Sequence, residues 1–205
     1  LYILFMAPPS DGVEWNDGGI EGTKRFLNKF WENIERLSKL EELEFSKNEE
    51  NIVRKVNQSI NSVSKHLDKF EFNTAVSDLM KLNNDISEYL KNSKSISKNS
   101  KDMIINNTCI LLFPMAPHIA SEIYEEYFKT ELINVAWPNV DTENLKDPTY
   151  ELVVQINGKK KHTRETNIGL EQTEVENICK EEFDMNISEF RKIIYIQDKI
   201  INFVG

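Results

Sequence analysis

Basic side chains cluster after a predicted two-residue turn near the end of the chain. They are Lys159, Lys160, Lys161 and Arg164, with His162 between them. Ammonium and guanidinium groups bind phosphate, and side chains alternate along an extended strand, so about half of this set would project from one face. Two interpretations follow: a phosphate-binding patch, or a charged edge strand that prevents sheets from pairing with one another. From the residues alone, we favour the edge strand.

Further basic residues could enlarge such a patch. Lys192 and Lys199 border a second predicted β-turn, and Arg191 precedes Lys192. In the first predicted long helix, Arg25 and Lys29 are spaced i, i+4 and therefore lie on one side. Phosphate contact and a solvated helix face explain Arg25 and Lys29 equally well, and both interpretations stay open.

The chain offers no catalytic set of side chains. His118 has only Glu122 as an acidic neighbour in helical register, so we expect a structural imidazole that is hydrogen-bonded to the backbone near a helix start. Cys109 and Cys179 have no second thiol or histidine at metal-ligand spacing. We therefore expect no metal site, and two buried free thiols in a protein of a reducing compartment.

Composition narrows the function classes further. A net charge of −9 over 205 residues argues against a general polyanion binder, although a locally basic surface is compatible with it. No run approaches the roughly 18 apolar residues that a membrane helix needs. The apolar segment 1–7 lacks a basic start and an initiator Met and is too short for a signal peptide, so we expect the chain to be part of a longer protein.

Apolar residues recur at helical spacing from about residue 20 to residue 128, which predicts a bundle of helices. The apolar stripes run through residues 26–37, 52–67, 72–90, 103–113 and 119–128. Pro114 should end or kink the fourth helix, and Pro117, with a fixed φ and no N–H, suits the first turn of the fifth. Short polar breaks between the stripes favour antiparallel neighbours in an up-down bundle.

The hydrophobic period changes after a polar link that closes with Asp147-Pro148. Two strands are predicted around Asn157-Gly158, the strongest two-residue hairpin signal, because both positions tolerate positive φ. A helix and two more strands, the latter around Gln197-Asp198-Lys199, complete a β-β-α-β-β order. The predicted segments are strands at 150–156 and 161–166, a helix at 171–183, and strands at 192–196 and 200–204.

The predicted fold is mainly α: an antiparallel helical bundle followed by a small α+β domain. The predicted parts are a connector at 1–19, the bundle at 20–138, the link at 139–148 and the α+β domain at 149–205. A module of this last size lies near the lower limit for independent folding.

The corner between the last two predicted helices reads Pro114-Met115-Ala116-Pro117-His118-Ile119-Ala120-Ser121-Glu122 and is followed by Trp137-Pro138. It resembles the anticodon-binding bundle of class Ia aminoacyl-tRNA synthetases. Further segments are similar to the bacterial and organellar type of leucyl-tRNA synthetase. They are Leu4-Phe5-Met6-Ala7-Pro8-Pro9 with Val13-Glu14-Trp15, Leu152-Val153-Val154-Gln155-Ile156-Asn157-Gly158-Lys159, Arg191-Lys192-Ile193-Ile194-Tyr195-Ile196 and Ile201-Asn202-Phe203-Val204.

The resemblance implies a tRNA-binding C-terminal portion that positions tRNA(Leu) for ATP-dependent leucylation. The His-Ile-Gly-His and Lys-Met-Ser-Lys-Ser motifs of class Ia catalysis are absent from these 205 residues. Catalytic residues, ATP, Mg²⁺ and the editing domain would therefore belong to other parts of the same polypeptide, and this portion needs no cofactor. The expected protein is a cytoplasmic bacterial monomer without membrane contact, or alternatively a mitochondrial or plastid one.

Given the resemblance, tRNA contact becomes the favoured role for the hairpin residues Lys159, Lys160, Lys161 and Arg164, and Lys192 and Lys199 could extend that patch. The resemblance also makes Arg25 and Lys29 candidate tRNA contacts, but a solvated helix face explains these two equally well. Two departures from the family pattern bear on these contacts: Gln197-Asp198-Lys199 replaces the usual Pro-Gly before Lys, and Lys160-Lys161 replaces a frequent Val-Arg pair. The alternative is a stand-alone interaction or scaffold protein, derived from a synthetase appendage, without a role in aminoacylation.

Overall fold

The computed structural model describes residues 1–12, 14–142, 145 and 149–205. It forms two compact units, Leu1–Leu145 and Lys146–Gly205, and each is described by itself. Val13, Asp147-Pro148 and part of the predicted link at 139–148 lie outside the described residues.

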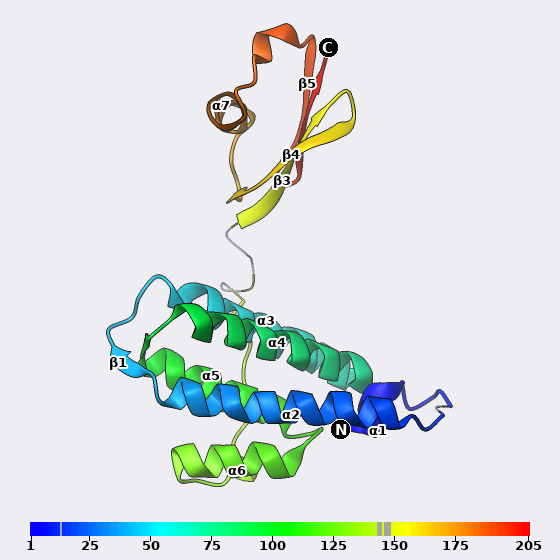
Figure 1. The fold of residues 1–205 in the computed structure, drawn as a ribbon, viewed down its shortest axis with the longest axis vertical. Coiled ribbons are helices and arrows are strands. Elements are labelled where there is room, and N and C mark those ends of the chain that lie inside the picture. Colours follow the sequence, from blue (N-terminus) through cyan, green and yellow to red (C-terminus); the bar gives the residue numbers. More distant parts are fainter. Residues whose placement is uncertain (13, 143–144, 146–148) are drawn as a thin grey trace. The chain divides into compact units, whose positions relative to one another are not determined.

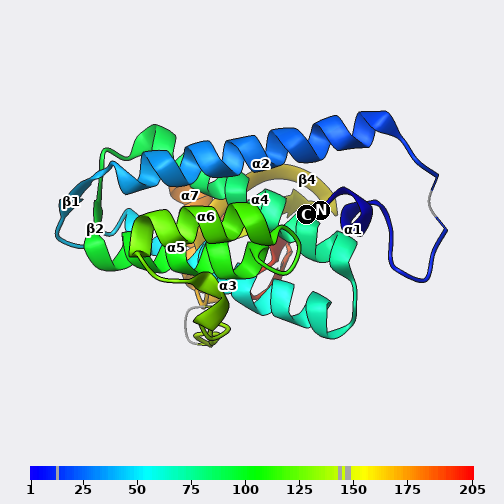
Figure 2. The same ribbon diagram turned by 90° about the horizontal axis from the view of Figure 1, so that it is seen from below.

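The first unit is an antiparallel helical bundle, as the apolar stripes predicted (Figure 1). Its helices are α1 (Tyr2–Met6), α2 (Asp17–Ser38), α3 (Glu49–Asp68), α4 (Phe72–Asn92), α5 (Lys98–Leu112) and α6 (Pro117–Phe128), with the short 3₁₀ helix η1 (Leu132–Asn134). The stripe residues form one buried core, in which Leu37, Val56 and Ile86 are fully inaccessible to solvent. Figure 1 and Figure 2 agree that α1 lies at the end of the bundle where α2 and α4 begin.

A polar layer joins α2 to α4 inside this bundle. The amide nitrogen of Asn33 donates to Asn83 Oδ1 at 2.7 Å and to Ser87 Oγ at 2.8 Å. Ser87 in turn donates to Asn33 Oδ1 at 3.1 Å. Since buried polar groups are costly unless they are hydrogen-bonded, this mutual pairing fixes the register of the two helices.

Two short strands close the far end of the bundle. Strand β1 (Glu41–Leu43) pairs in parallel with β2 (Ser95–Ser97), within segments that the sequence suggested to be polar breaks. Lys101, only 2% exposed, donates to the carbonyl oxygens of Ser38 and Leu40 and to Glu42 Oε1. Glu49, only 1% exposed, accepts hydrogen bonds from Ser46 and from both the N–H and the hydroxyl of Ser97.

The double-proline corner has the predicted form. Helix α5 ends at Leu112, and Pro117 occupies the first turn of α6. Met115, between them, is 3% exposed, and its N–H donates to Leu112 O at 3.0 Å. His118, however, is exposed, and no hydrogen bond joins its side chain to any described residue, so the prediction of a backbone-bonded imidazole is wrong. The first turn of a helix leaves that side chain pointing to solvent, since the core face of α6 is carried by Ala120, Ile123 and Tyr124.

A segment beyond η1 runs along α3 and forms side-chain hydrogen bonds with it. The indole N–H of Trp137 donates to Ser64 Oγ at 2.8 Å. The amide of Asn57 accepts from the N–H of Asp141 at 2.8 Å and donates to its carbonyl oxygen, as a neighbouring strand would. The amide of Gln58 donates to Leu145 O at 3.0 Å. The described residues 137–142 and 145, hereafter the α3 strap, are thus attached to the bundle at several points.

The second unit has the predicted β-β-α-β-β order. Its elements are β3 (Thr149–Ile156), β4 (Lys159–Asn167), α7 (Gln172–Phe183), the short 3₁₀ helix η3 (Ile187–Glu189), β5 (Lys192–Ile196) and β6 (Ile200–Val204). The strands form one sheet in the order β4-β3-β6-β5, with two antiparallel hairpins joined by the parallel pair β3 and β6. The predicted second strand is longer than expected and begins directly after the turn.

Turn chemistry and a small core hold this unit together. Asn157 and Gly158 both have positive φ, 49° and 76°, as the hairpin signal requires. Leu152, Val154, Ile201 and Phe203 project from one face of the sheet and are fully buried. They pack with other core residues, including Val175 and Cys179 of α7. The other face of the sheet is not covered by α7.

Candidate nucleic-acid interface

The three consecutive lysines of β4 lie on an edge strand directly after the hairpin turn. Lys159 pairs with Ile156 and Lys160 with Gln155, but a β-bulge leaves Lys161 without a partner before His162 pairs with Val154. The bulge interrupts the strict alternation that the sequence suggested. All three side chains are exposed, and the nearest carboxylate contact is Lys160 Nζ to Glu151 Oε1 at 4.0 Å.

Arg164 does not join these lysines. It pairs with Leu152 and therefore projects to the face that α7 covers, where its guanidinium forms an ion pair with Glu182. His162 lies on the same face, and its ring stacks on Phe183 with centroids 4.4 Å apart and planes 10° apart. Both side chains thus join the sheet to α7.

Lys192 and Lys199 belong to the opposite edge of the sheet. Lys192 begins β5 and pairs with Val204, whereas Lys199 lies in the turn before β6. Three strand spacings of about 4.8 Å separate β4 from β5, so the two edges are roughly 14 Å apart. The structure therefore divides the predicted basic set between two edges of one sheet.

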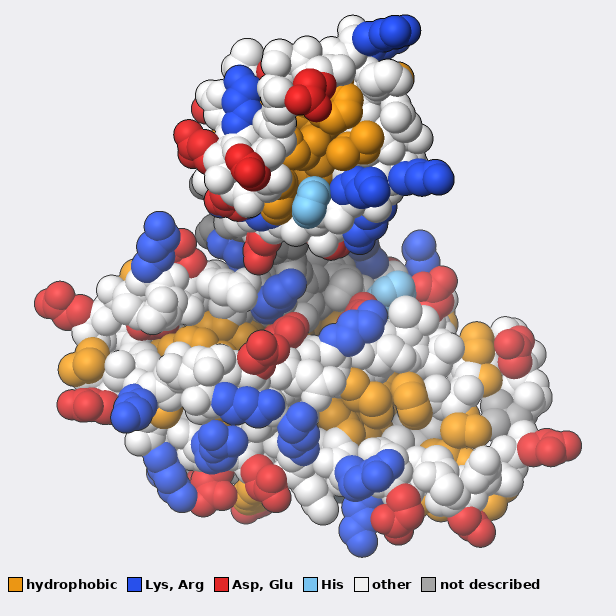
Figure 3. Space-filling view, turned by 45° about the horizontal axis from the view of Figure 1, so that its top comes forward, with side chains coloured by type: hydrophobic (Ala, Val, Ile, Leu, Met, Phe, Trp, Pro, Cys, Tyr) orange, Lys and Arg blue, Asp and Glu red, His pale blue; other side chains and the backbone are white. Residues whose placement is uncertain are grey.

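Charge in this unit is segregated. Residues 149–205 contain eight Lys and Arg against ten Asp and Glu, and four of the acidic residues, Glu174, Glu176, Glu181 and Glu182, belong to α7. Figure 3 shows most of the visible Lys and Arg side chains of this unit on one side, and most of the Asp and Glu, with a basic side chain among them, on the other. A polyanion would therefore meet the β3–β4 hairpin rather than the helix.

A second basic surface lies on α2. Arg25 and Lys29 are both exposed, and Lys29 Nζ donates to Asn84 Oδ1 of α4 at 2.9 Å. Arg36, on the same side of α2, donates to Leu90 O of α4 at 3.3 Å. We call Arg25, Lys29 and Arg36 the α2–α4 flank. No carboxylate of the described residues forms an ion pair with any of the three.

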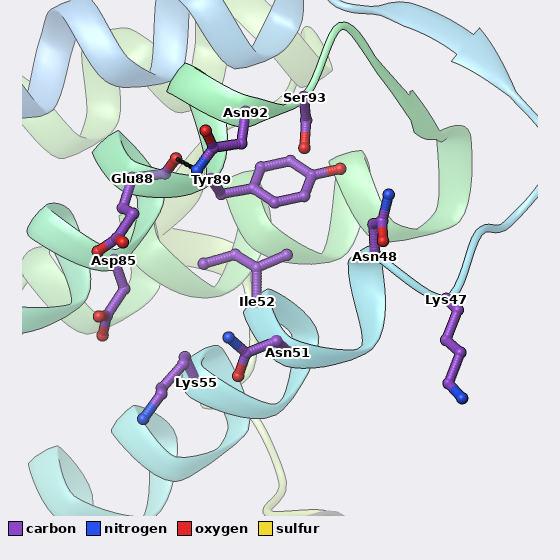
Figure 4. Close-up of a pocket in the computed structure, with 10 residues that line it drawn as sticks. All are labelled: Lys47, Asn48, Asn51, Ile52, Lys55, Asp85, Glu88, Tyr89, Asn92 and Ser93. Atoms are coloured by element: carbon purple, nitrogen blue, oxygen red, sulfur yellow. Dashed lines mark hydrogen bonds between the residues drawn. The ribbon is translucent and has the colours of Figure 1, made fainter. Parts of the chain in front are cut away.

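The sequence did not single out a polar pocket between α3 and α4, shown in Figure 4. Its residues lie on the polar side of two amphipathic helices, where periodicity alone gives no functional signal. The available signal was composition, since Asn48 and Asn51 lie at the start of α3 and Tyr89 and Asn92 lie at the end of α4.

The remaining chemical expectations concern thiols, metals and membranes. Cys109 and Cys179 are free and fully buried, as predicted, and burial raises the pKa of Cys109 to about 12 and that of Cys179 to about 11. Among the described residues, no group of His, Cys, Asp and Glu could hold a metal ion. Within the same residues, no helix is long and apolar enough to cross a membrane.

Comparisons with known proteins agree with this architecture. Leucine–tRNA ligases of Petrotoga mobilis and Thermosipho melanesiensis are 39% and 35% identical to the chain over 99% of its length, and that of Prochlorococcus marinus (strain MIT 9301) is 34% identical over all of it. The chain spans about a quarter of the length of these curated relatives. The fold matches agnB2 LeuRS of Agrobacterium radiobacter K84, crystallised in a ternary complex with tRNA and LeuAMS, with a TM-score of 0.72 at 22% identity, over 99% of this chain and 27% of that one.

The family model that describes the anticodon-binding domain of tRNA ligase matches residues 49–178. The match covers more than half of the chain and includes α3 to α6, the double-proline corner and most of α7. The chain therefore belongs to the family of anticodon-binding domains of tRNA ligases.

Proposed function

We propose that this chain is the tRNA-binding portion of a leucine–tRNA ligase and positions tRNA(Leu) for ATP-dependent leucylation at a catalytic domain elsewhere in the polypeptide. The observation that carries the proposal is similarity to leucine–tRNA ligases along the whole chain, over both compact units. ATP and Mg²⁺ would be bound by that catalytic domain, and an editing domain would complete a monomeric protein of the bacterial cytoplasm, or of a mitochondrion or plastid.

Two surfaces supply the contacts in this proposal. The bundle, residues 20–138, presents the α2–α4 flank to the tRNA backbone, and the domain at 149–205 presents Lys159, Lys160 and Lys161. Phosphate contacts of this kind position a nucleic acid without reading its sequence. Holding the acceptor end near a distant reactive centre raises its effective concentration there, which is how positioning accelerates a reaction.

The test is binding of an unmodified tRNA(Leu) transcript to the 205-residue chain at increasing salt. Replacing Lys159, Lys160 and Lys161 together by Glu should weaken binding at least about tenfold at low salt and lower the slope of log affinity against log salt by about 2. The matched control replaces three exposed lysines of the bundle, Lys65, Lys69 and Lys98, and should change affinity much less. Salt-independent binding, or equal losses in both triple variants, would refute the proposal.

The scaffold alternative rests on the net charge of −9 and on the neutralisation of Arg164 by Glu182. It predicts no binding of tRNA(Leu) even at low salt. The same titration therefore separates the two functions.

A further inference from the structure

A polar pocket of about 480 Å³ lies between the first turns of α3 and the last turns of α4. Its walls are Lys47, Asn48, Asn51, Ile52, Lys55, Asp85, Glu88, Tyr89, Asn92 and Ser93. Figure 4 shows the ring of Tyr89 at the centre, next to the side chain of Ile52. Lys47 and Lys55 lie on different sides of the ring, and Asp85 and Glu88 lie together along one wall. The volume falls within the range of small-ligand sites.

Some polar side chains of this pocket are hydrogen-bonded, since Asn92 donates to Glu88 O and the Tyr89 hydroxyl donates to Ser95 O, but five others are not. Among the described residues, no hydrogen bond or ion pair within 4.0 Å involves the side chains of Lys47, Asn48, Asn51, Lys55 or Asp85. Elsewhere in the bundle, polar groups between helices bond to one another, as in the layer that joins α2 to α4. Lys47, Asn48 and Asn51 are exposed, and Lys55 and Asp85 are half-buried, so these polar groups are available to a ligand that lies against the aromatic ring.

The chemistry of the walls fits a nucleotide. An aromatic face binds bases by stacking, whatever their sequence, and side-chain amides form hydrogen bonds with base edges. Ammonium groups bind the flanking phosphates. Burial raises the pKa of Asp85 more than the charge of nearby Lys55 lowers it. A hydrogen bond donated by an N–H group of the base would therefore stabilise the charged form of this carboxylate.

The pocket continues into a smaller one of about 220 Å³, with which it shares Lys55 and Asp85. The continuation runs between the same two helices and is lined by Ser59 and Ser62, whose hydroxyls donate to backbone carbonyl oxygens and keep their acceptor sites. It is also lined by Lys81, which is paired with Asp78 at 2.9 Å. Hydroxyl and ammonium groups are common ligands of phosphate and sugar. The chain of a single-stranded nucleic acid could therefore follow the groove after its base has entered the pocket.

We propose that this pocket binds one unstacked nucleotide from a single-stranded loop of the bound tRNA, with the base against Tyr89 and the phosphates near Lys47 and Lys55. The inference rests on the proposed function and adds a contact to the base, where the basic surfaces contact only the backbone. RNA recognition commonly takes this form, since loop bases are free to leave the stack and to lie on aromatic side chains.

The test compares two replacements of Tyr89 in the 205-residue chain, with the tRNA(Leu) transcript as probe. Tyr89→Phe keeps the ring and loses only the hydroxyl group, which donates to Ser95 O at 3.3 Å and is hydrogen-bonded to the Ser93 side chain, so binding should not change. Tyr89→Leu removes the aromatic face and should weaken binding about tenfold. Asn51→Leu, at an exposed residue without a partner, should weaken binding several-fold without affecting the fold.

Chemical probing of the transcript supplies a second measurement. One loop nucleotide should change its 2′-hydroxyl reactivity on binding to the wild type and to Tyr89→Phe, but not on binding to Tyr89→Leu. If folded Tyr89→Leu and Asn51→Leu bind like the wild type, with the same reactivity pattern, the pocket inference is wrong while the proposed function stands. If the wild-type chain does not bind the transcript at all, the proposed function is refuted and the pocket inference with it.

Discussion

Replacing Glu49 by Gln should destabilise the bundle by about 2 kcal/mol at neutral pH. The carboxylate accepts the N–H groups of Ser46 and Ser97 at 3.1 Å each and the Ser97 hydroxyl at 2.6 Å, and it is 1% exposed. Hydrogen bonds to a charged group contribute about 1.5–3 kcal/mol and those between neutral groups about 1 kcal/mol. Three weakened bonds, partly offset by the smaller cost of burying a neutral amide, give the figure of about 2 kcal/mol.

The pH dependence of this effect has a definite sign. Burial by itself raises the pKa of Glu49, but the hydrogen bonds from Ser97, Ser100 and the N–H of Ser46 bring it below its ordinary value of 4.5. Because the pKa is lower in the folded state, the carboxylate stabilises the fold above about pH 4.5, and this contribution is lost as the pH falls through the folded-state pKa. The stability difference between wild type and Glu49→Gln should therefore be constant above about pH 5.5 and should shrink below pH 4.5.

Urea unfolding followed by far-ultraviolet circular dichroism, at pH 7 and at steps from 5.5 to 3.5 (roughly one unit either side of the ordinary pKa), measures this difference. The matched control is Glu50→Gln, since Glu50 is the next residue of α3, is exposed and forms no side-chain hydrogen bond with described residues. The assignment of the effect to the buried carboxylate would be refuted by a stability difference between wild type and Glu49→Gln that stays the same at every pH. It would also be refuted by a control variant that loses as much stability as Glu49→Gln.

Other predictions concern backbone conformation and thiols. Phe70 ends the turn after α3 with φ 59°, so Phe70→Gly should be about 1 kcal/mol more stable in urea unfolding than Phe70→Ala, which keeps the strain; equal stabilities would contradict this. Gly158→Ala, at φ 76°, should destabilise the second unit by about 1 kcal/mol in the same assay, and an unchanged midpoint would argue against a strained turn. Cys109 and Cys179 should resist a disulfide reagent at pH 8 (about the ordinary thiol pKa) in the native protein, because burial raises the pKa of both thiols. Both thiols should react once the protein is unfolded in urea. Rapid labelling of the native protein would contradict this prediction and would show local opening.

Local rules were enough for much of the fold. The pairing of Pro114 with Pro117 predicted a helix end and a helix start, and the turn at Asn157-Gly158 predicted a hairpin. In both places the backbone requirement belongs to the residues themselves, so no distant contact was needed to identify it. The helical stripes were equally local, because one face of each helix is buried.

The candidate site was less predictable because its side chains are arranged by distant partners. A bulge set by pairing with β3 interrupts the alternation at Lys161, and Glu182 of α7 neutralises Arg164. Glu49 and Lys101 lie in segments whose composition suggested solvent, yet both are buried by contacts with residues about 50 or more positions away. Sequence patterns report which residues are basic or polar, and only the assembled fold decides which of them remain free.

The α3 strap shows how side chains of one helix can order a stretch of chain that is distant in sequence. Asn57 and Gln58 are neighbours in the middle of α3, yet they hold Asp141 and Leu145, more than 80 positions further along. Loss of Asn57 and Gln58 would therefore release the last described residues of the first unit without altering any of those residues.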